Sequence, residues 1–147
     1  FSFSVFARDA AGLYDTVIFD FPAGMDFSLY TGLPEGAIFL TVAVPDPVSV
    51  RDAAAVSSRL YEMSCPSRLV INNFTYSFVK RNLHRNIDDI IDSAGLQLVG
   101  VIPHSEELAF LSVNHRLKRK GKSNAAFLRL AGRLSGEQIL LPKLKKI

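Results

Sequence analysis

The strongest constraint on the fold is an alternation of short apolar stretches with helix-like stretches along the whole chain. Four stretches rich in β-branched and aromatic residues predict strands, at 15–21, 37–44, 68–72 and 97–102. Each is nearly continuous in hydrophobicity, as expected where helices cover both faces of a parallel sheet. The sequence therefore predicts an α/β fold with a mainly parallel sheet flanked by helices.

The stretches between these strands carry helix signals. An alanine-rich run at 47–63 opens with a proline, and 86–94 has acids in its first turn and a glycine directly after it. Ser105 precedes two glutamates, and 123–134 places Ala126, Phe127, Leu130 and Leu134 at helical spacing. No linker or repeat divides the chain, so we expect residues 1–147 to form a single domain.

Composition limits the class of protein. The 147 residues are 48% apolar and 21% charged, which is typical of a globular domain. The one cysteine, Cys65, cannot form an internal disulfide, and the longest apolar run, at 37–45, falls well short of the roughly 20 residues that span a membrane. We expect a cytoplasmic location. The first residue is Phe1, which suggests that the domain is incomplete and belongs to a longer gene product.

Charge is distributed unevenly. Residues 111–147 carry ten basic side chains and one acid, a net charge of +9, so the rest of the chain carries −6. This basic segment is a solvated surface, or it binds anionic lipid or nucleic acid.

Ligands of parallel α/β sheets bind beside the carboxyl ends of the strands. Asp20 ends an apolar stretch and is followed by Pro22, Ala23 and Gly24, where the backbone can approach a ligand closely. A carboxylate there suits a hydrated magnesium ion, although such residues often only cap a loop.

Five sequence segments, in order, resemble one family. YDTVIFDFPAG at 14–24 resembles the second nucleotide motif of the MinD/ParA group of P-loop ATPases, and it is most similar to the MinD branch. PVSVRD at 47–52, LVIN at 69–72, the segment 87–103 ending in GVIP, and Ser-Val-Asn at 112–114 continue the resemblance. It covers the chain from about residue 14 to residue 134.

The resemblance implies an ATP-dependent switch, in which magnesium-ATP promotes a homodimer and hydrolysis releases it. It implies that Asp20 holds magnesium through water and that Pro22, Ala23 and Gly24 sense the γ-phosphate. It further implies that Asn72 contacts adenine and that Pro103 packs near the base. His104 and Ser105 stand where the family usually has an acid.

The phosphate-binding loop of the family is absent from this chain. Gly121-Lys122-Ser123 is no substitute, because the pattern G-x-x-x-x-G-K-[ST] needs glycine where Arg116 stands. The resemblance thus covers the C-terminal portion only, so binding of ATP and magnesium would require an upstream half. We expect the isolated chain to hydrolyse no ATP. We also expect a gap in the sheet between the strands at 15–21 and 37–44. Either the missing half fills it, or this chain re-pairs its strands or exchanges elements with a second copy.

The remaining reactive residues favour no other chemistry. The histidines at 84, 104 and 115 are isolated in sequence from other ligand types, and Cys65 has no histidine nearby to activate it. No serine-hydrolase motif is present.

The C-terminal residues 139–147, ILLPKLKKI, place Leu140, Leu144 and Ile147 on one stripe away from Lys143, Lys145 and Lys146. The segment is similar to the membrane-targeting tail of MinD proteins, which implies peripheral attachment to the inner face of the cell membrane. A packed or disordered tail is the alternative. Non-specific DNA binding through 116–122 is less favoured.

Two functions stay open. The first is the C-terminal part of a MinD/ParA-like ATPase that regulates position within the cell, in cell-division site placement or in partitioning. The second is a non-catalytic interaction, membrane-binding or DNA-binding module that keeps the fold without nucleotide chemistry.

Overall fold

The computed structural model describes residues 2–22, 34–77, 86–109 and 121–143. It contains two compact units, Phe1–Ile38 and Phe39–Ile147.

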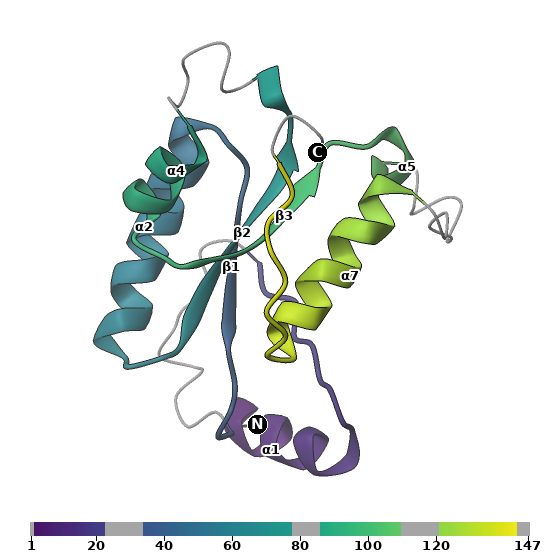
Figure 1. The fold of residues 1–147 in the computed structure, drawn as a ribbon. Helices are drawn as coiled ribbons and strands as arrows, with labels where there is room; N and C mark the ends of the chain where they lie inside the picture. The colour runs from purple at the N-terminus through teal and green to yellow at the C-terminus, as the bar shows by residue number, and fades with distance from the viewer. Residues whose placement is uncertain (1, 23–33, 78–85, 110–120, 144–147) are drawn as a thin grey trace. The chain divides into compact units, whose positions relative to one another are not determined.

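The second unit is built on a parallel sheet of three strands, β1 (Phe39–Ala43), β2 (Ser67–Phe74) and β3 (Leu98–Pro103), in the order β1-β2-β3 (Figure 1). The strands coincide with three of the stretches predicted from hydrophobicity. Consecutive strands are neighbours and run parallel, so the connection between each pair must cross back over a face of the sheet. The predicted fold class is confirmed.

Helices cover both faces of this sheet. Helices α2 (Pro47–Glu62) and α4 (Ile87–Ala94) lie on one face, and α7 (Lys122–Leu134) lies on the other (Figure 1). Leu69 and Ile71 of β2 pack in the core on the α2 and α4 side, whereas Val70 packs with Ala126 of α7. Because adjacent residues of a strand point to opposite faces, burial of all three explains the unbroken apolar run.

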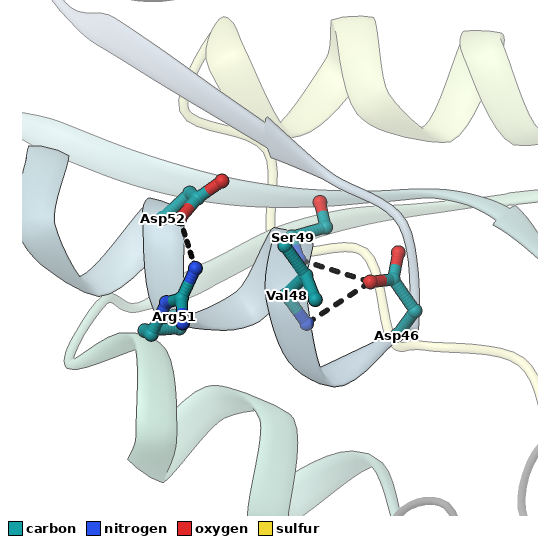
Figure 2. Close-up of polar contacts among 5 residues, drawn as sticks. All are labelled: Asp46, Val48, Ser49, Arg51 and Asp52. Atoms are coloured by element: carbon teal, nitrogen blue, oxygen red, sulfur yellow. Dashed lines mark hydrogen bonds and ion pairs between the residues drawn. The ribbon is translucent and has the colours of Figure 1, made fainter.

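The ends of α2 and α4 follow from single side chains. The Asp46 carboxylate accepts hydrogen bonds of 3.0 Å from the backbone N–H groups of Val48 and Ser49, which begins α2 (Figure 2). Asn86 caps α4 in the same way, through the N–H of Asp89 at 2.9 Å. Gly95 ends α4 with a left-handed backbone, φ 64°, as its position after the helix predicted.

Helix α7 packs closely on β3 at a residue that has no side chain. A Cβ atom at Gly100 would lie 3.0 Å from Cδ1 of Leu130. The glycine therefore sets how near the helix can come to the sheet.

The first unit contains a helix, α1 (Phe3–Leu13), which the sequence patterns did not indicate. The strand predicted at 15–21 is wrong, because these residues are not assigned to a strand and none of them belongs to the sheet that the described residues form. A strand exists through its pairing with a neighbour. Here the aromatic side chains of the segment pack on α1 instead, with ring centroids 4.9 Å apart for Phe3 and Phe19 and 5.6 Å apart for Phe3 and Phe21.

A short helix, α5 (Glu106–Ala109), is separated from the end of β3 by two residues. Within the four described ranges, no helix is long and apolar enough to cross a membrane.

Candidate functional site

The polar residues of interest lie where the three parallel strands end. Ala43, Phe74 and Pro103 are the last residues of β1, β2 and β3. Parallel strands place their carboxyl ends at the same edge of a sheet, and this is the edge at which such folds bind ligands. The residues at the ends of β2 and β3 make the contacts that define the candidate site.

A β-bulge shapes the end of β2. Ile71 pairs with Val101 and Phe74 pairs with Pro103, so β2 has one more residue than β3 between the two pairs. Asn72 and Asn73 together oppose Ile102. Asn73 has φ 54°, in the left-handed region that asparagine tolerates better than most residues, and its N–H donates to Oδ1 of Asn72 at 2.9 Å.

The residue after β3 connects to this bulge. The backbone N–H of His104 donates to the carbonyl oxygen of Phe74 at 2.8 Å, and Nδ1 of its ring lies 2.7 Å from Oδ1 of Asn73. All three polar side chains, Asn72, Asn73 and His104, are exposed. The edge of the sheet therefore carries a row of amide and imidazole side chains held by two neighbouring strands.

The predicted site residues fall into two groups. Asn72 is exposed and Pro103 is buried, and they belong to the ends of neighbouring strands, β2 and β3. Asp20 and Pro22 are exposed and belong to the other unit, Phe1–Ile38. Ala23 and Gly24 lie outside the described residues. The roles predicted for all these residues stay predictions.

Sequence reasoning assigned no role to Asn73 and did not predict its contact with His104. A consecutive pair of asparagines is a signal for a left-handed residue, and it stood at the end of a predicted strand. The partner of His104 is 31 positions away in the chain, so its contact depends on the register of β2 and β3.

No cluster of histidine, cysteine and acidic side chains that could hold a metal occurs in the part of the chain that the structure describes. Among the described residues, one buried side-chain oxygen has no hydrogen-bond partner, namely Oγ1 of Thr41 in β1. It lies within the sheet, away from the strand ends where ligands bind.

The C-terminal segment is described as far as Lys143. Its residues 137–143 are not helical, and the Leu140 side chain is 91% exposed. Leu144, Lys145, Lys146 and Ile147, which would complete the predicted amphipathic stripe, lie outside the described residues.

A scan against family profiles gave no match. The septum site-determining protein MinD of Bacillus subtilis is 27% identical over 139 residues, which is 90% of this chain and 52% of that protein. A putative MinD of Emiliania huxleyi is 28% identical over 134 residues, which is 86% of this chain and 48% of that protein.

Solved structures agree. The MinD cell division protein of Aquifex aeolicus superposes with a TM-score of 0.82 at 26% identity, covering 97% of this chain and 62% of that one. The chain is similar to MinD. A chain of the MinC:MinD cell division complex of the same organism gives a TM-score of 0.79 at 28% identity, covering 95% of this chain and 59% of that one.

The MinD of Pyrococcus horikoshii, solved with Mg-ADP, shares the fold with a TM-score of 0.71 at 20% identity, over 90% of this chain and 57% of that one. This chain spans about half the length of the curated MinD relatives it matches. The similarity supports the prediction that this chain corresponds to the C-terminal portion of a MinD-like protein.

Proposed function

We propose that this chain is the C-terminal part of a MinD-like ATPase that acts as an ATP-dependent dimerisation switch in placing the cell-division site. The observation that carries the proposal is the similarity to MinD over nearly the whole chain, at 27–28% identity in the two relatives above. The shared fold of a MinD solved with Mg-ADP supports nucleotide binding as the family's chemistry.

The roles of individual residues form part of this proposal. Asn72, at the end of β2, contacts the adenine edge, with Pro103 at the end of β3 beside the base. Asp20 holds magnesium through water, and Pro22, Ala23 and Gly24 respond to the γ-phosphate. The exposed position of Asp20 leaves its carboxylate accessible to a hydrated ion.

The isolated chain is expected to hydrolyse no ATP, because it has no loop of backbone N–H groups and lysine to neutralise the triphosphate. The full gene product, in contrast, is expected to turn over ATP. In that protein Asp20→Ala abolishes turnover, and Asp52→Ala, an exposed carboxylate on α2, serves as the matched control. Turnover by the 147-residue chain that Asp20→Ala removes would contradict the first expectation. A full gene product without turnover would favour the non-catalytic module.

Membrane binding is the second part of the proposal. The segment after α7 exposes Leu140 almost fully and continues into lysines at 143, 145 and 146. Such a segment binds anionic lipid weakly, and dimerisation raises its avidity.

Leu140→Glu is therefore expected to lower co-sedimentation with anionic liposomes severalfold, because it places a charge at the apolar stripe. Leu128→Glu on α7, where the leucine is 64% exposed, is the matched control and should leave sedimentation unchanged. Equal sedimentation of both variants with the parent chain would rule out this tail as the lipid anchor. Loss of binding in both would indicate a non-specific effect of charge.

A further inference from the structure

The end of α7 turns the chain back in a fixed direction. The backbone N–H of Gly136 donates to the carbonyl oxygen of Arg133 at 3.0 Å. The N–H of Glu137 reaches further back, to the carbonyl oxygen of Gly132 at 2.9 Å. Gly136 itself has φ 89°, in the left-handed region. This pair of hydrogen bonds is a Schellman motif, so the chain leaves α7 along a direction that the backbone determines.

A glycine in the last turns of α7 provides the surface on which the next segment packs. A Cβ atom at Gly132 would lie 2.5 Å from Cδ1 of Ile139 and 3.0 Å from Oε2 of Glu137. Carbon atoms in contact prefer separations of about 3.5–4.0 Å, so a side chain at this position would displace Ile139. Glycine is unfavourable inside a helix, and here its missing side chain makes room for the segment.

An arginine joins the same segment to the sheet. Nε of Arg133 donates to the carbonyl oxygen of Ile139 at 2.7 Å, and NH1 donates to that of Val99 in β3 at 2.8 Å. Hydrogen bonds from a guanidinium are stronger than neutral ones, and its planar shape fixes both acceptors relative to each other. Residues 137–143 are therefore held at two points, and we call them the strap.

The strap runs toward the edge of the sheet that carries the candidate site. Figure 1 shows it in yellow, running back beside α7 and ending near the carboxyl end of β3. Ile139 and Val99 are joined through Arg133, near the start of β3. The end of the strap at residue 143 thus lies far from the end of α7.

The side chains of the strap differ in exposure. Ile139 is partly buried against Gly132, whereas Leu140 is 91% exposed and Lys143 is exposed. The strap is not helical, so Leu140 is held outward by the backbone contacts of its neighbour rather than by a helix. An apolar side chain followed by a lysine is the combination that binds the surface of an anionic bilayer.

We infer that the strap is a positioning device, held by Gly132 and Arg133, that presents Leu140 and Lys143 to anionic lipid in a preformed arrangement. This inference rests on the proposed function, because it takes lipid as the partner of the C-terminal tail. Gly132 and Arg133 are positioning residues that act through the strap. A segment that is ordered before binding loses less conformational entropy on binding, so the strap raises the affinity for lipid.

Co-sedimentation with vesicles of equal parts phosphatidylglycerol and phosphatidylcholine tests the inference. Gly132→Gln places a Cβ atom where Ile139 lies, and it is expected to lower the partition constant of the 147-residue chain about fivefold. Glutamine favours helix, so α7 is retained, and the net charge is unchanged. Ala131→Gln adds the same side chain at the exposed neighbouring position and should leave the partition constant unchanged.

Nitrogen-15 relaxation of the backbone amides measures the order of the strap directly. In the parent chain and in Ala131→Gln, residues 137–141 are expected to have order parameters near about 0.85, as in a rigid backbone. In Gly132→Gln the values are expected to fall below about 0.6. A role of Gly132 in α7 alone would not change the order of residues beyond the helix.

The outcomes separate this inference from the proposed function. If Leu140→Glu lowers the partition constant and Gly132→Gln does not, the tail binds lipid but the role of the strap is wrong. Tighter binding by Gly132→Gln would also overturn the inference, because the strap would then withhold Ile139 from lipid. A strap as mobile in the parent chain as in Gly132→Gln has the same meaning. If the parent chain does not bind the vesicles, both the lipid anchor and the role of the strap are wrong.

Discussion

At the scale of single residues, Asp46 shows how one side chain determines where a helix begins. Its Oδ1 accepts from two backbone N–H groups, those of Val48 and Ser49, which would otherwise lack partners in the first turn of α2. Asp52, six residues further along, has only a 3.5 Å exposed ion pair with Arg51 (Figure 2). Asp46 therefore caps the first turn of α2, whereas Asp52 makes only an exposed ion pair.

Asp46→Ala is expected to lower the free energy of unfolding by about 1 kcal/mol, because the capping hydrogen bonds are lost. Asp52→Ala should change it by less than about 0.5 kcal/mol, since exposed ion pairs contribute little. Urea denaturation followed by circular dichroism measures both. Asp46→Asn retains an oxygen acceptor and should lie near the parent chain. Equal losses for the two alanine variants would show that charge rather than capping determines the effect.

At the scale of elements, Arg133 joins α7, β3 and the segment that follows α7. Its NH1 donates to the carbonyl oxygen of Val99 at 2.8 Å, and its Nε donates to that of Ile139 at 2.7 Å. Val99 is the extra residue in a register shift between β2 and β3, so its carbonyl needs a partner from elsewhere. Burial, followed by the charge of Arg129, lowers the pKa of Arg133 from its usual value.

Arg133→Ala is expected to destabilise the chain by about 2 kcal/mol, because two charge-assisted hydrogen bonds to carbonyl oxygens are lost. Amide exchange in residues 137–143 should become faster at the same time. Arg129→Ala, which removes the same charge from the same helix, is the control and should have a small effect. Arg133→Lys keeps the charge without the planar fork and should restore only part of the stability. Unchanged exchange in 137–143 would show that the segment is held by other contacts.

At the scale of the whole molecule, the sheet has an edge at β1. Leu40 and Val42 alternate with Thr41 and Ala43 along this strand, and Val42 is 59% exposed. In the portion of the chain that is described, β1 pairs with β2 only. An edge strand with exposed apolar side chains is a template for pairing with another chain.

We therefore expect the 147-residue chain to self-associate through β1, and Val42→Lys to shift it toward monomer by placing a charge on the edge. Val48→Lys on α2 is a matched control, because Val48 is 57% exposed but lies on a helix. Light scattering after size-exclusion chromatography measures the mass. A parent chain that is monomeric at all concentrations would contradict the expectation. So would a mass that Val42→Lys and Val48→Lys reduce equally.

What the sequence by itself determined was local. Continuous apolar runs predicted three strands with both faces covered, because burial on both sides requires apolar residues at every position. Proline near the start of α2, acids in the first turn of α4 and glycine after α4 marked helix ends, because these positions favour particular side chains. Shared motifs also predicted the similarity to MinD, since several segments matched in order.

Tertiary structure decided the rest. The segment 15–21 has the composition of a strand, but pairing needs a neighbour, and its aromatic rings pack on α1 instead. The bulge that places Asn73 beside His104 depends on the register of two strands, and the Arg133 contacts depend on how α7 lies on β3. These features join residues about thirty positions apart, so no local pattern encodes them. Their physical origin is the packing that brings distant segments within hydrogen-bonding distance.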